Sequence, residues 1–248
     1  LNELARQAPM PSGVSSYNPP ERFAAPGPGD GPLGKTHDVI DAFLRAPDWD
    51  TQLKYAYQGD SLRPAVEEYH EKWPFQQTDR FSLQLFSMEL DPSVGGPYWV
   101  YLVSTSDIDQ GYPVIVRTEG GDLKVDWEVY SEFRDKHYVK FLEGSIASPH
   151  TLRVVIERVS DYYGPDREAF PNLSDYYVYQ VNPPYGGLNE FSSYAFVKKD
   201  SQLASELDSV VGLNEEPLAV IVTLEEKPFA HGINHLMVTD YVTEGWFR

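Results

Sequence analysis

Two carboxylates flank a tryptophan near the middle of the chain, in the stretch KVDWEVYSEF (124–133). Asp126 and Glu128 are residues of the type that glycoside hydrolases use as an acid and base pair, roughly 5 to 10 Å apart across a cleft and with different pKa values. Because the chain contains 38 Asp and Glu, pairs with this spacing also arise by chance. A raised pKa inside a pocket would distinguish a functional pair.

A helix beginning at the same place explains these carboxylates without any chemistry. Asp126 would cap the helix, Glu128 would lie in its first turn near the positive end of the dipole, and Gly144 would end it. An aromatic stripe would form one face: Trp127, Tyr130, Phe133, Tyr138 and Phe141. Glutamates and lysines at four-residue spacing would form the other: Glu128, Glu132, Lys136 and Lys140. The sequence favours this single helix, with Trp127 packed where the two halves of the chain meet.

Histidines give no recognisable catalytic or metal motif. The stretch HGINH (231–235) contains two histidines but lies between two runs of strand type, so a hairpin turn is the favoured interpretation. His37, His70 and His150 have no nucleophile setting around them. The sequence contains no nucleophile elbow, no phosphate-binding loop and no dinucleotide-binding fingerprint. We therefore assign no catalytic residue, no metal ligand and no cofactor.

Tyrosines gather in the segment 158–179, beside several carboxylates. Aromatic faces next to carboxylates build sugar-binding clefts and cages for quaternary ammonium groups. The candidate ligand-binding residues of this segment are Tyr162, Tyr163, Tyr176 and Tyr177. An aromatic-rich hairpin explains the same residues and is favoured, because a glycine and two prolines place turns within the segment.

Composition excludes several classes of partner. The 248-residue chain has a formal net charge of −18, which repels phosphate backbones and anionic headgroups. We therefore expect no nucleic-acid partner and no membrane contact by the folded part, which also lacks an apolar run long enough to span a bilayer. With no cysteine, the chain has no disulfides and no thiolate chemistry.

Periodicity predicts an α+β fold. Helices are expected at 36–47, 48–57 and 61–73, capped by Thr36, Asp48 and Ser61, and a last helix at 201–212, capped by Ser201. Strands are expected at 81–90, 98–105, 112–119, 122–125, 151–159, 176–181, 191–199, 218–227 and 235–247. The leading helices should pack on a curved, mainly antiparallel sheet (residues 36–145), and a second antiparallel β-β-β-α-β-β unit should follow (146–248).

The first 35 residues have the composition of a linker. Prolines recur among glycines and serines from Pro9 to Pro32, which gives an extended, semi-rigid segment. The sequence starts at Leu1 without a methionine. We expect an extracytoplasmic domain that is anchored through a segment upstream of Leu1.

Two stretches resemble a known group of proteins. FLRAPDWDTQLKYA and GYPVIVRTEGGDLKVDWEVYSEF are similar to an uncharacterised bacterial family that is often tethered to the membrane. The resemblance implies a nuclear transport factor 2-like (cystatin-like, SnoaL-like) fold for residues 36–145. Enzymatic members of that fold carry an Asp/His pair inside a conical pocket, for which His70 and Asp107 are the candidates here, and neither is assigned as catalytic.

These observations predict a non-catalytic binding or assembly domain that recognises a protein or small-molecule ligand through a concave aromatic surface. A pocket enzyme of the dehydratase or isomerase type is one alternative, and an aromatic-lined carbohydrate-binding protein is another. Buried Asp or His residues with perturbed pKa values inside the cone would support the enzyme. A cone sealed by aromatic side chains would count against it.

Overall fold

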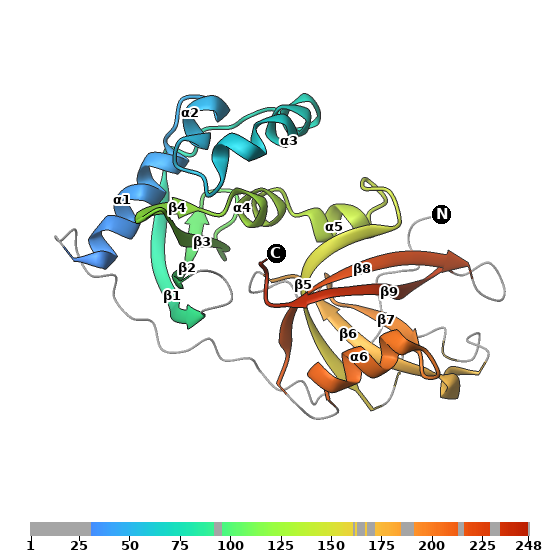
Figure 1. Ribbon diagram of the computed structural model, residues 1–248. Coiled ribbons are helices and arrows are strands. Elements are labelled where there is room, and N and C mark those ends of the chain that lie inside the picture. Colours follow the sequence, from blue (N-terminus) through green and yellow to red (C-terminus); the bar gives the residue numbers. More distant parts are fainter. Residues whose placement is uncertain are drawn as a thin grey trace. The chain divides into compact units, whose positions relative to one another are not determined.

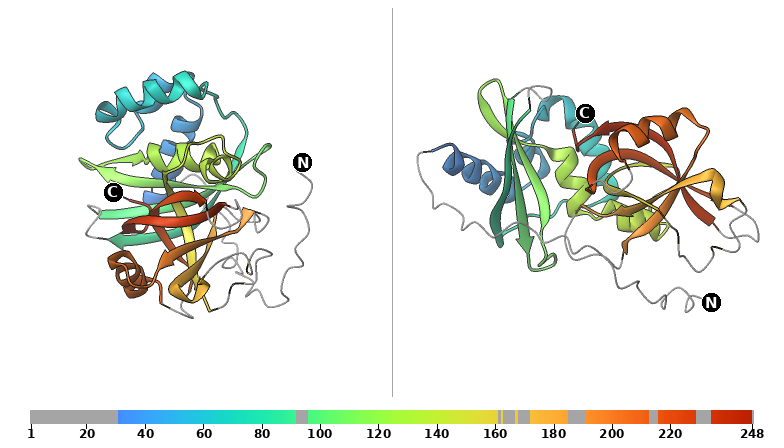
Figure 2. Two further views of the ribbon diagram at one scale, coloured as in Figure 1. Left: turned by 90° about the vertical axis from the view of Figure 1, so that its right-hand side faces the viewer. Right: turned by 90° about the horizontal axis from the view of Figure 1, so that it is seen from below.

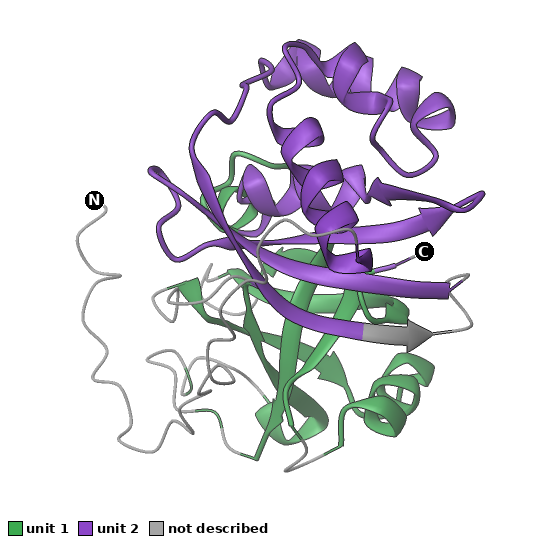
Figure 3. Cartoon of the chain, turned by 90° about the vertical axis from the view of Figure 1, so that its left-hand side faces the viewer, with its two compact units in different colours: residues 1–21, 139–183, 189–246 green, residues 22–138, 184–188, 247–248 purple. Residues whose placement is uncertain are grey.

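The chain divides into two compact units, shown in different colours in Figure 3. The computed structural model describes residues 31–91, 96–160, 162, 167, 172–184, 191–212, 216–228 and 234–247. Of these, the N-terminal unit contains residues 31–138 together with Pro184 and Phe247, and the C-terminal unit contains the others. The division falls between residues 138 and 139, whereas the sequence places a boundary at 145 and 146.

The N-terminal unit begins with three helices (Figure 1). These are α1 (Pro32–Leu44), α2 (Trp49–Leu53) and α3 (Gly59–Lys72). The expected cap of the second helix is confirmed, because the Asp48 carboxylate accepts a hydrogen bond of 2.7 Å from the Thr51 amide. None of the described helices is long and apolar enough to cross a membrane.

The other two predicted caps are wrong. Helix α1 starts earlier, at Pro32, because proline suits the first turn of a helix. Thr36 therefore lies inside the helix, where its hydroxyl donates to the Leu33 carbonyl at 2.8 Å. Helix α3 starts at Gly59, after Gln58 in the left-handed region (φ 52), so Ser61 lies in its first turn and donates to the Gln58 carbonyl at 2.8 Å.

The helices precede a four-stranded antiparallel sheet with the order β1-β2-β3-β4. Its strands are β1 (Phe81–Asp91), β2 (Gly96–Thr105), β3 (Tyr112–Glu119) and β4 (Asp122–Val125). Residues 55–57 cover the β4 edge, where Val125 exchanges two backbone hydrogen bonds of 2.8 Å with Tyr55 and Tyr57. Large side chains that are almost fully buried fill this unit, among them Phe43, Tyr101, Tyr112, Tyr130 and Phe133.

The single helix expected after β4 is wrong in part, because the structure has two short helices there. They are α4 (Trp127–Arg134) and α5 (His137–Leu142), and they are separated by Lys136, which has a left-handed backbone (φ 54). The predicted row of glutamates and lysines is broken at this point, and Glu132 is buried. Asp126 does cap α4, and Gly144 follows α5 in the left-handed region (φ 74), as expected.

The C-terminal unit is a closed five-stranded barrel with strand order β5-β6-β7-β9-β8 (Figure 2). Its strands are β5 (His150–Val159), β6 (Tyr176–Asn182), β7 (Ser193–Lys198), β8 (Leu218–Pro228) and β9 (Asn234–Glu244). Helix α6 (Gln202–Val210) lies between β7 and β8 in the chain, and its predicted cap is confirmed by a 3.1 Å bond from the Ala204 amide to the Ser201 hydroxyl. A short 3-10 helix (Leu173–Asp175) precedes β6.

The α+β class and the order of elements are confirmed in both units. One pair differs from the antiparallel expectation: β7 and β9 run parallel and close the barrel. A five-stranded Greek-key barrel in which β5 pairs with both β6 and β8, with a helix between the third and fourth strands, has the topology of the oligonucleotide/oligosaccharide-binding (OB) fold. Inward-facing aliphatic residues such as Leu152, Val154 and Val222 are fully buried in it.

Candidate functional site

The carboxylate pair that opens α4 has a structural role. Asp126 is buried, its Oδ1 accepts from the Val129 amide at 3.1 Å, and its Oδ2 accepts from the Arg117 guanidinium at 3.1 Å. Arg117 in turn lies 4.0 Å from the centre of the Tyr57 ring and 4.9 Å from that of Phe247. A small pocket lies beside the Arg117–Asp126 ion pair. The residues that line it are Tyr57, Gln58, Leu62, Arg117, Asp126 and Glu128. Both oxygens of Asp126 are engaged within the protein, which does not suit an acid and base pair.

Trp127, between the two carboxylates, belongs to the core of the N-terminal unit. Only 5% of its surface is exposed, and its ring packs edge-on against Tyr69 at 5.1 Å and His70 at 6.4 Å. A tryptophan exposed in a polar cleft would have favoured the catalytic interpretation. The observed burial supports the helical one.

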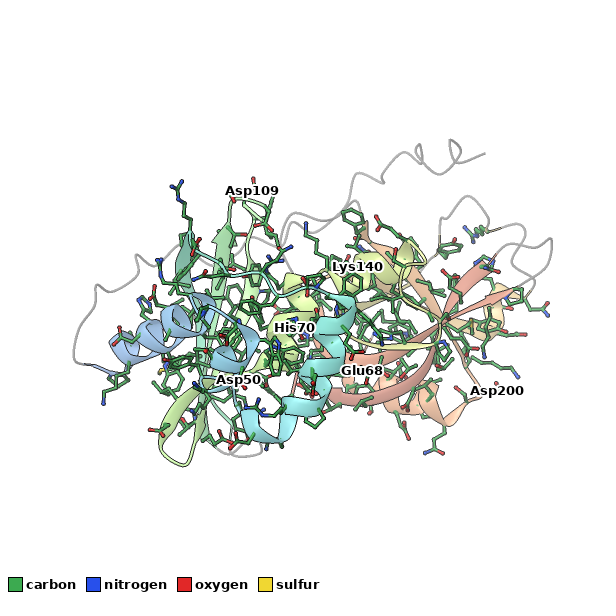
Figure 4. The ribbon with its side chains drawn as sticks, turned by 90° about the horizontal axis from the view of Figure 1, so that it is seen from above. Asp50, Glu68, His70, Asp109, Lys140 and Asp200 are labelled. Carbon is green, nitrogen blue, oxygen red and sulfur yellow. The ribbon has the colours of Figure 1, made fainter. Side chains whose placement is uncertain are left out.

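Around Trp127 the structure brings together seven aromatic rings, which we call the ring cluster. Its members are Trp49, Tyr69, His70, Trp73, Phe75, Trp127 and His137. His70, labelled in Figure 4, lies at the centre, with Trp49 stacked at 6.3 Å and Tyr69 and Phe75 edge-on at 5.3 and 5.7 Å. His137 extends the cluster by stacking on Tyr69 at 5.9 Å. Apart from Trp127, every ring is partly exposed.

Helices α2, α3, α4 and α5 and the segment after α3 position the ring cluster, with Trp127 at the start of α4 and His137 at the start of α5. Trp49 is the first residue of α2, which the Asp48 cap fixes, and Arg63 of α3 lies over its ring at 5.9 Å while pairing with Asp50. Helix α3 contributes the next two rings, and the segment after α3 contributes Trp73 and Phe75. Sequence patterns do not point to Trp49, Trp73 or Phe75, because single aromatic residues at helix ends carry no periodic signal.

Polar groups lie against one side of the ring cluster. The Tyr69 hydroxyl donates to the Asp135 carboxylate and lies 3.4 Å from His137 Nε2. Asp135 also pairs with Arg134 at 3.4 Å, and Arg134 donates to the Gln76 side chain at 3.2 Å. Burial, reinforced by the charge of Asp135, raises the pKa of Tyr69 far above its ordinary value. Tyr69 is therefore a neutral hydrogen-bond donor at physiological pH.

The two candidates for a catalytic dyad, His70 and Asp107, have different partners. His70 contacts rings and the Trp73 carbonyl, which lies 2.8 Å from its Nδ1. Asp107 accepts from the Thr105 hydroxyl at 2.7 Å and lies 3.9 Å from the Arg134 guanidinium. The Thr105 hydrogen bond lowers the pKa of Asp107. A general base near neutral pH would need the opposite shift.

Of the four tyrosines proposed for ligand binding, the three that the structure describes do not share one surface. Tyr162 is buried in a small apolar cluster with Val178 and Phe196, against which Tyr176 also packs. Tyr177 follows Tyr176 in β6 and so points to the other side of the sheet, where the Arg158 guanidinium lies 3.8 Å from its ring centre. Tyr163 lies outside the described residues.

The two histidines of HGINH give no metal site that the structure describes. His231 lies outside the described residues, and the buried His235 packs edge-on against Phe196 at 5.6 Å. Within the described ranges, no three His, Asp or Glu side chains are placed to hold a metal ion.

Comparison of the chain with protein-family models, with curated proteins and with solved structures returns no match. The resemblance to a nuclear transport factor 2-like family therefore stays a prediction.

Proposed function

We propose that the chain is a non-catalytic binding domain whose ligand-binding surface is the ring cluster. In this proposal the segment before α1 tethers the domain outside the cytoplasm. The observation that carries it is the contact of seven rings, six of them partly exposed, beside the Asp135 and Arg134 side chains. Rings that expose part of a face supply contact area at little entropic cost, and neighbouring polar groups orient a ligand.

Packing inside the N-terminal unit supports a binding role over catalysis. Phe43 packs edge-on against Tyr130 at 4.8 Å, and Tyr112 lies 6.1 Å from Tyr130. All three rings are buried, and an interior filled by aromatic side chains counts against a pocket enzyme. Burial raises the pKa of Tyr130 to about 12, so this phenol stays neutral at physiological pH.

The barrel topology favours a second binding candidate, the outer face of β6 and β7. OB folds bind oligonucleotides or oligosaccharides across the corresponding strands. The C-terminal unit has sixteen Asp and Glu and only seven Lys and Arg between residues 139 and 246, which is unsuited to a phosphate backbone. Tyr176 and Tyr194 are partly exposed aromatic residues on this face. By analogy of fold, these features support an oligosaccharide ligand.

Thermal unfolding in the presence of candidate ligands tests the ring cluster as the binding surface. A ligand at a concentration of 100 times its Kd stabilises the folded state by about 2.7 kcal/mol, which raises the melting temperature. We expect Trp49→Ala and Trp73→Ala each to remove the shift caused by a ligand from a library of neutral oligosaccharides and peptides. Phe86→Ala is the control, because Phe86 is an exposed ring on β1 outside the cluster.

A ligand whose stabilising effect survives in both tryptophan variants would refute this surface. If only a Tyr194→Ala variant lost the effect, the barrel face would be the binding site instead. The location outside the cytoplasm is tested separately, by fusing the full-length gene product to a reporter enzyme that is active only after export.

A further inference from the structure

We infer that the outer edge of β1 binds the same edge of a second copy of the chain, so that the two sheets join into one continuous antiparallel sheet. The inference does not depend on the proposed function, because the ring cluster contains no residue of β1. Three observations carry it: an uncovered strand edge, exposed apolar side chains on that strand, and a sequence that can pair with itself.

The two edges of the sheet in the N-terminal unit differ. Residues 55–57 cover the β4 edge through the two backbone hydrogen bonds of Val125. Strand β1 lies at the other edge and pairs with β2, and no backbone hydrogen bond from another described segment reaches its outer side (Figure 1). An edge strand has N–H and C=O groups that point away from its sheet, and these groups can bond to another strand.

The side chains of β1 leave this edge accessible. Residues 81–88 are all partly or fully exposed, whereas most of the neighbouring β2 is buried. Phe86 and Met88 are 40% and 57% exposed, and they are two of the three large apolar side chains that are exposed among the described residues. Natural edge strands are commonly protected by lysine, by proline or by being short. Strand β1 has 11 residues and contains neither lysine nor proline.

A bulge in β1 determines how two copies of the strand can pair. The pairing with β2 shifts between Leu85 and Ser87, so Gln84 and Ser87 point to one face of the sheet while Leu83 and Met88 point to the other. Opposite residues of an antiparallel pair point to the same face. A register with Gln84 opposite Ser87 of the second copy, and Leu83 opposite its Met88, meets this condition on both sides of the bulge.

Charge complementarity supports the same register. Arg80, which precedes β1 and is exposed, comes opposite the position of Asp91 at the end of the strand in the second copy. The two-fold axis repeats this pair of opposite charges at the other end. Residues 81–88 carry no charge. Because each copy has a net charge of −18, self-association needs a contact without like charges, and β1 provides one.

The proposed contact is small. It consists of backbone hydrogen bonds along one pair of strands and of the side chains beside them, including the contact of Leu83 with Met88, which occurs twice. Contacts at the low end of interface size belong to transient complexes. We therefore expect a reversible dimer whose population increases with the concentration of the chain.

Cysteine substitutions test the register, because the chain contains no cysteine. One sample carries Gln84→Cys and another carries Ser87→Cys, both at partly exposed positions. Opposite residues have Cα atoms about 4.5 to 5.5 Å apart, which a disulfide can span. Two copies of the same variant place their cysteines three residues apart along the strands, or about 10 Å. We expect mild oxidation to cross-link the mixture of the two variants, and neither variant alone.

Sedimentation velocity over a range of concentrations of the whole chain measures the association. The wild-type chain should pass from monomer to dimer as its concentration rises. Met88→Lys should raise the Kd of the dimer about tenfold, because the lysine enters the pair of strands twice. Val242→Lys is the matched control, since Val242 is also an exposed apolar residue of a strand, β9, and should leave the Kd unchanged. Circular dichroism checks that both variants are folded.

A wild-type chain that is monomeric at every concentration would overturn the inference and leave the β1 edge to a strand from a different protein. A dimer that Met88→Lys and Val242→Lys affect alike would show that the copies associate through another surface. Cross-linking of either cysteine variant alone, without cross-linking of the mixture, would refute the proposed pairing.

Discussion

The carboxylate of Asp126 accepts two hydrogen bonds of 3.1 Å, one from the Val129 amide in α4 and one from the guanidinium of Arg117 in β3. Both charged side chains are only 8% exposed. One residue thus caps a helix and ties that helix to the sheet. The stretch KVDWEVYSEF is the junction between strand and helix that the sequence favours, with an ion pair that the sequence does not reveal.

Asp126→Asn should destabilise the fold by about 3 kcal/mol, because it removes the charge of one partner from a buried ion pair. Asparagine is as good a helix cap as aspartate, so the loss reports the ion pair. The free energy of unfolding in urea measures this loss. Asp48→Asn is the control, since Asp48 is an exposed cap of α2 and should lose less than about 1 kcal/mol. Equal losses in the two variants would contradict a structural role for the Arg117 pair.

Local signals predicted the elements well. The strands at 112–119 and 122–125 have the predicted bounds, and the Asp48, Asp126 and Ser201 caps are confirmed. The alternation of apolar and polar residues in strands and the capping of helix ends each involve residues only a few positions apart. Both can therefore be recognised in a single sequence.

The features that failed depend on contacts between distant residues. Closure of the barrel by the parallel pair β7 and β9 joins Ala195 to Leu236, and no local pattern encodes that pairing. The ring cluster combines Trp49 with Trp127, 78 residues further along the chain. The break between α4 and α5 at Lys136 was missed because lysine is a good helix former that gives no warning of a left-handed backbone.

Lys136→Gly and Lys136→Ala test that break. Both substitutions delete the same charged side chain, but only glycine adopts a backbone with φ of 54 without steric cost. We expect the glycine variant to be more stable than the alanine variant by about 1 kcal/mol. The free energy of unfolding in urea measures the difference. A more stable alanine variant would show that α4 and α5 form one continuous helix in solution.

Tyr179 should make the protein sensitive to alkaline pH. Burial raises the pKa of its phenol from 10.0 to about 12. Well below pH 10 the phenol is neutral in both the folded and the unfolded chain. Its contribution to stability therefore does not change with pH there. Between about pH 10 and 12 the unfolded chain ionises while the folded chain keeps the proton, and stability falls as pH rises.

Tyr179→Phe removes this dependence and tests it. The hydroxyl has no hydrogen-bond partner among the described residues, so its loss at pH 7 should change stability by less than about 1 kcal/mol. At pH 11 the variant should gain about 1 kcal/mol relative to wild type. Urea unfolding at the two pH values measures both effects. An equal difference at pH 7 and pH 11 would mean that Tyr179 ionises normally in the folded chain.

Gly59, the first residue of α3, determines how closely α3 approaches α2, and therefore how Trp49 meets His70. A Cβ atom at Gly59 would lie 2.1 Å from the backbone carbonyl oxygen of Leu53, which cannot move without displacing α2. Gly59→Ala should therefore destabilise the fold by about 3 kcal/mol, at the upper end of the cost of overpacking.

Gly31→Ala is the matched control, because a Cβ there meets no atom within 4 Å and the loss should stay below about 1 kcal/mol. Urea unfolding compares the two variants, and near-ultraviolet circular dichroism reports the packing of the tryptophans. If Gly59→Ala unfolded like Gly31→Ala with an unchanged aromatic signal, α2 and α3 would not be held together as closely as the structure shows.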